Sequence, residues 1–252
     1  MDEEPASGLA AELEEISRNA WPALRQTERD GWLLRQAYGH TKRANSVHTL
    51  FPGSTPLVEM IAWAETAYAR AGLASIFRLT PLSPEELEDE LIARGYDVVE
   101  PSLVKVTDMQ SAWKRVPEVT LSDLDDAAWL SAFAQAGGLT SVQQTILRAM
   151  LGAIVPNARL ARVEEHGEAV AFGMAVAERG YVSFYDMLTR SDHRRCGHGR
   201  KIMESLMAWG REEGAVRGAL QVVEANAPAR ALYASFGFRT VYGYRYRVLR
   251  PT

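Results

Sequence analysis

The strongest chemical signal in the sequence is a short glycine-containing segment surrounded by cations. It reads Arg194-Arg195-Cys196-Gly197-His198-Gly199-Arg200-Lys201, and a helical pattern follows it. Glycines let the backbone curl until several N–H groups point into one concavity, and the N-terminus of a helix adds partial positive charge. Residues 181–188, just before this segment, are rich in β-forming side chains. The order strand, glycine loop, helix predicts a binding site for a diphosphate.

The charges around this loop support the same prediction. Five cations fall within twelve residues: Arg190, Arg194, Arg195, Arg200 and Lys201. Cations at the N-terminus of a helix oppose its dipole, so we expect an anion to balance them. Charge-assisted hydrogen bonds to such an anion would contribute roughly 1.5–3 kcal/mol each.

The elements that must position this loop belong to an internal repeat. Three glycines recur 142 positions later: Gly31 as Gly173, Gly72 as Gly214, and Gly95 as Gly237. Both halves fit the order strand, strand, helix, strand, helix, strand. The last two pairs also suit the C′ position after a helix, where left-handed geometry selects glycine.

Hydrophobic spacing predicts the individual elements. In the first half we expect a helix with the face Leu57, Ile61, Ala64 and Tyr68, then a strand over 75–79, a helix over 84–93 and a strand over 96–106. In the second half we expect a helix with the face Ile202, Leu206 and Trp209, then a strand over 216–223, a helix over 228–236 and strands over 238–249. Helices over 123–135 and 141–151 lie between the halves, with Asp123 and Ser141 as N-caps.

The two halves differ where the chemistry is expected. We place the domains at 1–112 and 113–252, with the boundary in the stretch 110–117, where Pro117 also falls. The first-half counterpart of the glycine loop, residues 49–56, has one glycine, two prolines and no cation. Proline lacks an N–H donor, so this half should not bind phosphate. It would supply a wall of the cleft, or only stability.

Two motifs of the second half resemble those of the GNAT superfamily of acyl-CoA N-acyltransferases. The first is Arg194-Arg195-Cys196-Gly197-His198-Gly199, which meets the Arg/Gln-x-x-Gly-x-Gly/Ala pattern of that family. The second runs from Asn226 to Phe238 and meets Asn-x-x-Ala-x-x-x-Tyr-x-x-x-Gly-Phe. The resemblance covers residues 119–248, and the whole chain resembles tandem members with a degenerate first copy. It implies an α+β fold of two GNAT-like halves, each a mixed, mostly antiparallel sheet flanked by helices.

The resemblance implies acetyl-CoA as the cofactor and assigns residues to it. Backbone N–H groups of residues 195–200 would bind the pyrophosphate. In the preceding strand, backbone groups would pair with the pantetheine arm, and one N–H would polarise the thioester carbonyl. The implied cofactor-binding residues are Met187, Leu188, Thr189, Arg194, Arg195, Cys196, Gly197, His198, Gly199, Arg200, Asn226 and Ala229.

Tyr233 is the candidate general acid. It shares the spacing of a buried helical face with Ala229, Leu232 and Phe236, which by itself favours a tyrosine of the core. The resemblance instead implies that Tyr233 protonates the departing thiolate. Since a thiol of pKa about 8.5 is already a fair leaving group, the acid would contribute roughly a hundredfold.

Two carboxylates are candidates for the general base that deprotonates the amine, directly or through water. Asp186 stands one residue before the expected cofactor strand segment, and Glu224 stands at the end of the next strand. Each of them also fits a carboxylate that simply faces solvent at a strand end. We favour Asp186, because aspartate is disfavoured inside a strand.

The expected function is acetyl transfer from acetyl-CoA to a primary amine, directly, within a ternary complex. The first alternative is a non-catalytic acyl-CoA-binding or regulatory module. A Rossmann enzyme is disfavoured because Ile202 stands where the third glycine of Gly-x-Gly-x-x-Gly belongs. An acyl-cysteine route through Cys196 would need a neighbouring base such as His193 or His198, and direct transfer needs no thiol.

Composition bounds the remaining classes. The chain has 252 residues, a net charge of −4 and one cysteine. It has no long basic stripe, so we expect no nucleic-acid partner. No apolar run approaches the roughly 20 residues of a membrane helix, so we expect a cytoplasmic monomer or homodimer that does not bind membranes. No His, Cys and acidic residues have metal-ligand spacing, and the amine acceptor, a small molecule, is not identified further.

Three residues of the first half complete the expectations. Trp21 and Trp32 should belong to the core. Asn45, in the polar run Arg43-Ala44-Asn45-Ser46, would either face the cleft and bind substrate or bridge the backbone, and we favour the second role.

Overall fold

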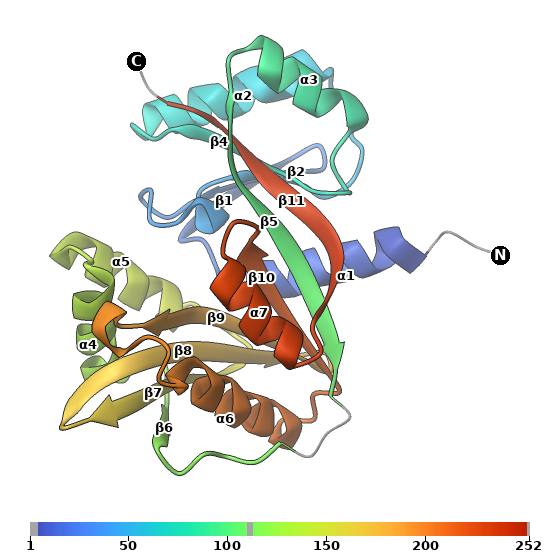
Figure 1. Cartoon of the computed structure of the whole chain (residues 1–252). Helices are drawn as coiled ribbons and strands as arrows, with labels where there is room; N and C mark the ends of the chain where they lie inside the picture. The colour runs from blue at the N-terminus through green and yellow to red at the C-terminus, as the bar shows by residue number, and fades with distance from the viewer. Residues whose placement is uncertain (1–4, 110–112, 251–252) are drawn as a thin grey trace. The chain divides into compact units, whose positions relative to one another are not determined.

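The computed structural model describes residues 5–109 and 113–250, and its contacts divide the chain into two compact units (Figure 1). The first unit comprises Met1–Val104, Val223–Ala225 and Val241–Thr252, and the second comprises Lys105–Val222 and Asn226–Thr240. The boundary expected at residue 112 lies outside the described residues. The units differ from the expected ranges 1–112 and 113–252 chiefly because the last strand of the chain belongs to the first unit. Among the described residues, no helix has the length and the apolar character that crossing a membrane requires.

The first unit contains a mixed sheet. Its elements are α1 (Pro5–Ala20), β1 (Arg25–Arg29), β2 (Trp32–Gln36), β3 (Val47–Thr49), α2 (Leu57–Arg70), β4 (Ser75–Leu79), α3 (Glu85–Ala93), most of β5 (Asp97–Asp108) and most of β11 (Arg239–Leu249). β1, β2 and β3 pair antiparallel in chain order, β3 pairs parallel with β4, and β4 pairs antiparallel with β11. The final strand of the chain therefore completes the sheet of the first unit.

The core of the first unit forms where α2 and α3 cover this sheet. Phe77 of β4 packs edge-on against Trp32 and Tyr96, with ring centroids 5.7 and 5.6 Å apart. Of the predicted helical face of α2, Ile61, Ala64 and Tyr68 are buried in the same cluster. Leu57 is partly buried and packs against it. The expected burial of Trp21 and Trp32 is confirmed.

A buried ionic network also lies in the first unit, and the sequence did not predict it. Glu14 of α1 accepts hydrogen bonds from Arg78 Nε at 2.8 Å, Arg78 Nη2 at 2.7 Å and the Tyr242 hydroxyl at 2.7 Å. Burial alone would raise the pKa of Glu14, but Arg78 outweighs it and the pKa is lowered. Removing one partner of such a pair leaves a buried charge uncompensated. The ion pair therefore holds α1 against β4, and the Tyr242 hydroxyl adds a hydrogen bond from β11.

After one strand and two helices, the second unit repeats the order strand, strand, strand, helix, strand, helix of the first unit. It contains β6 (Val119–Ser122), α4 (Ala127–Gly137), α5 (Ser141–Gly152), β7 (Asn157–Glu165), β8 (Glu168–Glu178), β9 (Tyr181–Thr189), α6 (His198–Glu212), β10 (Arg217–Val223) and α7 (Ala227–Ser235). β6, β7, β8 and β9 pair antiparallel in chain order, and β9 pairs parallel with β10. The mixed, mostly antiparallel α+β fold expected from the sequence is confirmed.

Helices cover both faces of the second sheet. Phe172 of β8 contacts the rings of Trp129 and Phe133 in α4. Its neighbour Gly173 points the other way, toward Ile202 and Leu206 of α6. Because β8 is buried on both faces, it reads as an almost continuous apolar run.

Most element boundaries agree with the predictions to within two residues, but two caps were wrong. Asp126, and not Asp123, caps α4 by accepting from Trp129 N. Thr140, and not Ser141, caps α5, in a capping box with Gln143. Each half also has three strands before its first helix of the repeat, where we expected two.

The repeat holds for two of the three glycine pairs. Gly72, Gly95, Gly214 and Gly237 all have positive φ after a helix, as predicted. The pair Gly31 and Gly173 is not equivalent: Gly31, with a φ of +80°, turns the chain between β1 and β2, whereas Gly173 lies inside β8.

Asn45 has the structural role that we favoured, because its Oδ1 accepts from Ala37 N and Gly39 N.

Candidate functional site

A β-bulge between β8 and β9 shapes the candidate site. Phe172 pairs with Leu188 and Met174 pairs with Tyr185, so the single residue Gly173 faces two residues of β9, Asp186 and Met187. Asp186 has a φ of +51°, a left-handed conformation that aspartate tolerates better than most residues. An added Cβ at Gly173 would lie 2.6 Å from Ile202 Cγ2 and 2.7 Å from Met187 Sδ. Glycine is therefore required where α6 and the bulge meet.

The bulge coincides with the end of a strand pairing. β9 and β10 pair from Tyr181 and Arg217 to Phe184 and Leu220, yet β9 continues to Thr189. The rest of β9, which includes Asp186, Met187 and Leu188, extends beyond this pairing. Backbone polar groups beyond a paired edge are available to a ligand.

The glycine loop begins α6 next to this strand end. Arg195 and Gly197 both have positive φ, at +69° and +84°. Gly197 is the N-cap of α6 and makes no side-chain cap, and the first turn contains no acidic residue. The Gly197 carbonyl accepts from the N–H groups of Arg200 and Lys201. Since the N–H groups before these have no partner within a helix, the loop fits an anion such as a diphosphate.

The prediction that an anion must balance all five cations was too strong. Arg190 lies 2.7 Å from Glu168 and 3.1 Å from Asp192, and Lys201 lies 3.0 Å from Glu118. Arg200 donates to Ser235 Oγ at 2.8 Å and lies over the Phe236 ring. Among the described residues, Arg194 and Arg195 pair with no carboxylate, and both are exposed. These two are the cations left to a ligand.

Tyr233 lies on α7, the helix beside the start of α6. A Cβ on Gly199 would lie 3.3 Å from Leu232 of α7, so the two helices are in contact there. Tyr233 is 7% exposed, and burial raises its pKa to about 12. Within the described part of the chain, its hydroxyl makes no hydrogen bond. The phenol is thus protonated at neutral pH, as a proton donor must be.

The remaining predicted residues have more ordinary positions. Asn226 caps α7, and its Oδ1 accepts from Ala229 N at 3.2 Å, so the structure gives this pair a capping role. Contact of Asn226 or Ala229 with a cofactor stays a prediction. Glu224 is exposed, its N–H donates to Pro101 O at 2.8 Å, and its contacts assign it to the first unit. The structure groups Asp186 and Tyr233 in the second unit and does not group Glu224 with them.

Cys196 and His198 occupy different environments within the loop. Cys196 is exposed, whereas His198 is 2% exposed. Among the described residues, no group of histidine, cysteine and acidic side chains could hold a metal ion.

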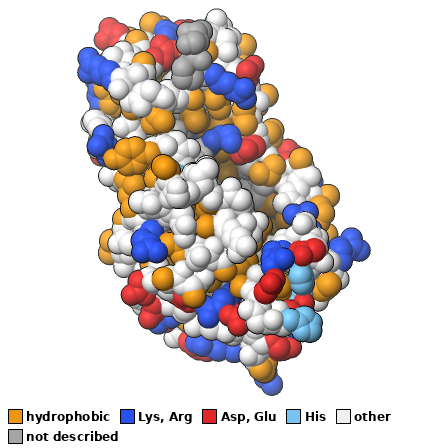
Figure 2. Space-filling model, turned by 90° about the vertical axis from the view of Figure 1, so that its left-hand side faces the viewer, with side chains coloured by type: hydrophobic (Ala, Val, Ile, Leu, Met, Phe, Trp, Pro, Cys, Tyr) orange, Lys and Arg blue, Asp and Glu red, His pale blue; other side chains and the backbone are white. Residues whose placement is uncertain are grey.

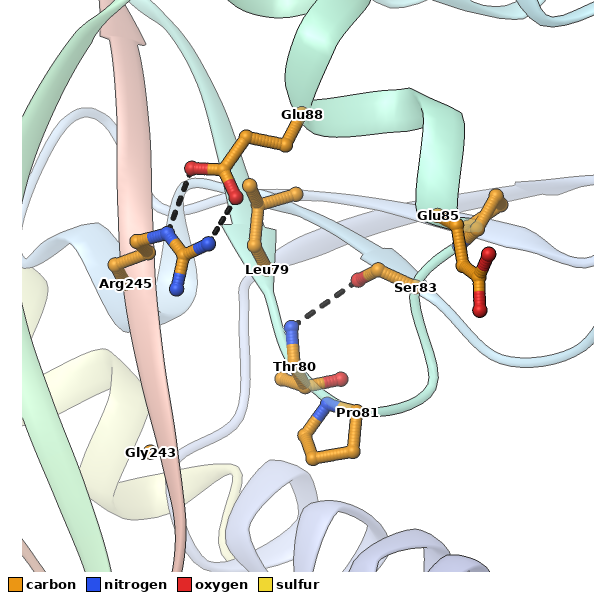
Figure 3. Close-up of a pocket in the computed structure, with 9 residues that line it drawn as sticks. Leu79, Thr80, Pro81, Ser83, Glu85, Glu88, Gly243 and Arg245 are labelled. Carbon is orange, nitrogen blue, oxygen red and sulfur yellow. Dashed lines mark hydrogen bonds and ion pairs between the residues drawn. The ribbon is translucent and has the colours of Figure 1, made fainter.

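The first half has other residue types at the 142-residue offset. The residues 142 positions before Asp186, Gly197 and Tyr233 are Ala44, Thr55 and Leu91. A cavity of about 280 Å³ lies where β4 ends and α3 begins, and Figure 3 shows Glu88 reaching across it to Arg245. Arg245 and Arg247 both bond Glu88, and Arg245 first of all holds its pKa at about 2. This carboxylate is neutralised and has no glycine loop beside it.

Sequence reasoning missed the bulge, although a signal for it was present. A glycine inside an apolar strand pattern indicates a bulge or a close backbone approach. Gly173 and Asp186 are that glycine and that interrupting polar residue. Glu165, which approaches His198, had no local signal because it lies 33 positions away.

Known proteins resemble the chain over nearly its whole length. The model of the family described as "Probable histone acetyltransferase Rv0428c C-terminal" matches residues 10–247. The Bacillus subtilis (strain 168) protein named "Uncharacterized N-acetyltransferase YobR" is 26% identical over 243 residues, which are 94% of this chain and 98% of that protein. "Probable histone acetyltransferase Rv0428c" of Mycobacterium tuberculosis is 28% identical over 243 residues, 93% of this chain and 72% of that protein.

Solved structures share the fold. A GCN5-related N-acetyltransferase from Kribbella flavida covers 97% of this chain and 96% of its own, with a TM-score of 0.67 and 16% identity. A tandem GNAT protein from the clavulanic acid biosynthesis pathway covers 95% of this chain and 88% of its own, with a TM-score of 0.62 and 12% identity. At these identities the likeness concerns the fold alone.

The substitution Gly173→Ala tests the bulge. The new methyl group would overlap Ile202 and Met187, so we expect a loss of stability of about 1–3 kcal/mol, as for other overpacked sites. Thermal unfolding followed by circular dichroism measures the loss. Gly152→Ala is the matched control, because a Cβ there meets nothing within 4 Å. Equal stability of the two variants would contradict the packing described here.

Proposed function

The chain belongs to the family of the Rv0428c C-terminal region, a family of GNAT N-acetyltransferases, and from this premise we propose that it transfers an acetyl group from acetyl-CoA to the primary amine of a small molecule. The proposal includes direct transfer within a ternary complex. A lysine side chain of a protein is the second class of acceptor, which the name of the Mycobacterium relative suggests.

One observation carries the proposal. The pairing of β9 with β10 ends at Phe184, immediately before the bulge at Asp186. A short 3₁₀ helix, Ser191–His193, follows β9, and the glycine loop at the start of α6 comes next. An extended acyl pantetheine has amides that can pair with a strand edge as a peptide does. In coenzyme A this arm is joined to a diphosphate, just as the strand edge here is followed along the chain by the glycine loop. The geometry supports a ligand with both parts, and acetyl-CoA is such a ligand.

The residues of the loop suit the diphosphate. Main-chain N–H groups of residues 197–199 would bind it, with Arg194 and Arg195 adding charge. Gly197 provides no side-chain cap and the first turn of α6 contains no acidic residue, which supports this assignment. A capping side chain or a carboxylate at this place would compete with a bound anion.

Two side chains would accept and donate the protons of the reaction. The bound coenzyme supplies the acetyl thioester. Asp186 would accept a proton from the substrate ammonium, directly or through water, so that the nitrogen lone pair can bond to the carbonyl carbon. A backbone N–H from residues 187–189 would stabilise the carbonyl oxygen. As the carbon–sulfur bond breaks, Tyr233 would donate its proton to the thiolate, which its pKa of about 12 supports by keeping the phenol protonated.

The first unit would be a degenerate copy that serves substrate selection or stability. The matching order of elements in both halves supports a common origin. The replacement of the loop glycine and the tyrosine by Thr55 and Leu91 supports the loss of catalysis in this half.

The rival proposal is a module that binds acyl-CoA without turning it over. A panel of small amines, polyamines and lysine peptides, monitored by thiol release from acetyl-CoA, separates the two. Turnover with any acceptor supports the enzyme, whereas tight binding of acetyl-CoA without turnover across the panel supports the rival.

Tyr233→Phe tests the general acid. It keeps the buried ring and removes the proton, so we expect kcat to fall roughly a hundredfold with little change in stability. Steady-state kinetics and thermal unfolding measure both. Tyr38→Phe is the matched control, because Tyr38 is 60% exposed and contacts Arg25. A Tyr233→Phe enzyme with unchanged kcat would exclude the proposed acid.

Asp186→Asn tests the general base, and it is a fair test because asparagine also tolerates positive φ. We expect a roughly hundredfold lower rate at neutral pH and a changed acidic limb of the pH–rate profile. Glu224→Gln is the parallel variant. A profile altered only by Glu224→Gln would transfer the role of base from Asp186 to Glu224.

A further inference from the structure

The glycine loop contains a buried histidine. His198 is the first residue of α6 and is 2% exposed. Within the described residues neither of its ring nitrogens makes a hydrogen bond, and its Nε2 lies 3.4 Å from Glu165 Oε1. A buried imidazole without hydrogen bonds is costly unless another contribution compensates it. Because the Glu165 carboxylate lies nearby, we attribute this compensation to electrostatic attraction.

The Glu165 carboxylate lies near two histidines, His193 and His198. Its other oxygen lies 3.8 Å from His193 Nε2, and the two imidazole rings are 6.5 Å apart. Glu165 ends β7, whereas His193 belongs to the short 3₁₀ helix Ser191–His193 that precedes the glycine loop. The carboxylate therefore links the β7–β8 hairpin to both ends of the loop segment 193–198.

Further charges lie close to this group on β8 and on residues 190–192. His193 Nδ1 lies 2.9 Å from Asp192 Oδ1, and Arg190 joins Asp192 to Glu168 of β8. His193 and Arg190 together hold the pKa of Asp192 at about 2. Figure 2 shows histidine side chains among acidic and basic ones on the face that it displays. A cavity of about 620 Å³ borders Glu168, Arg190 and Asp192, so solvent protons can reach the network.

The charges do not balance when both imidazoles are neutral. Asp192 and Glu168 carry two negative charges, of which Arg190 offsets one. Among the described residues, the groups within ion-pair distance of the Glu165 carboxylate that can carry positive charge are the two histidines. Protonation of His198 would complete the pair with Glu165, but it would also place a cation at a helix N-terminus, which the dipole opposes. A diphosphate bound to the loop would place negative charge at this helix N-terminus and would favour the protonated imidazole.

We propose that His198 is a positioning residue that takes up a proton when the coenzyme diphosphate binds, and that the resulting ion pair with Glu165 holds the glycine loop in its binding conformation. This inference rests on the proposed function, since it concerns the same coenzyme. It adds a buried side chain and a proton to the backbone N–H groups and the two exposed arginines of the proposed site.

The sign of the pH dependence follows from linkage. If binding takes up a proton, the complex is favoured where the imidazole is already protonated, and affinity falls as the pH rises. We expect the Kd to rise about tenfold between about pH 5.5 and about pH 8.5, the range over which imidazoles lose their proton.

The probe must not titrate in that range itself. The 3′-phosphate of coenzyme A has a second ionisation near pH 6, so acetylated 3′-dephospho-coenzyme A is the ligand. Isothermal titration calorimetry in buffers of different ionisation enthalpy gives the Kd and the number of protons taken up at each pH. The full-length protein is used throughout.

His198→Gln and Glu165→Gln are the test variants. Both retain polar side chains of similar size, and we expect each to bind the probe with less than a twofold change in Kd across the pH range and with proton uptake reduced to near zero. His166→Asn is the matched control, because His166 is exposed in the adjacent β7–β8 turn at a φ of +53°, which asparagine tolerates. This control should keep the wild-type pH dependence.

The possible outcomes distinguish failure of the proposed coenzyme site from failure of the proposed role of His198. No binding of the probe at any pH by the wild-type protein would refute the coenzyme site itself. Binding with a pH-independent Kd, or with a pH dependence that His198→Gln retains, would overturn the role of His198 alone. Circular dichroism of the variants shows whether each has folded, and NMR titration of the His198 ring protons, with and without the probe, gives the same answer from wild-type protein.

Discussion

The second unit depends on a contact in which no side chain is allowed. Gly173 brings β8 against Ile202 of α6 and Met187 of β9 at distances that exclude even a methyl group. This close approach accompanies the bulge at Asp186, and the bulge follows directly on the last paired residues of β9 and β10. The helix that packs on Gly173 is also the helix whose N-terminus carries the glycine loop. One packing constraint thus sets both the free strand edge and the position of the loop beside it.

The features of the site that follow are electrostatic. Gly197 leaves the first N–H groups of α6 without a side-chain cap, and Arg194 and Arg195 remain exposed beside them. The other cations of the loop are held by carboxylates or by Ser235. Glu165 lies near two histidines of which one is fully enclosed. The loop therefore approaches the β7–β8 hairpin through Glu165 and the two histidines, whereas its exposed arginines are available to an anion.

The sequence predicted the elements well where spacing or special glycines specify them. The face of α2, the strand β4 and the helix-ending glycines at 72, 95, 214 and 237 follow from local rules, as did the motif residues of α6 and α7. Contacts between distant segments had no such signal. The pairing of β4 with β11, the burial of Glu14 against Arg78 and the approach of Glu165 to His198 each join residues far apart in the chain. The two misplaced caps failed for a smaller reason, since Asp123 and Asp126, like Ser141 and Thr140, are both good capping residues by type.

The most direct measurement is a crystal structure of the protein with acetyl-CoA. The account predicts diphosphate oxygens about 2.7–3.2 Å from the main-chain nitrogens of residues 197–199, with the acyl arm against the backbone of β9 beyond Asp186. A coenzyme bound elsewhere, or a glycine loop that contacts only solvent at saturating coenzyme, would contradict it.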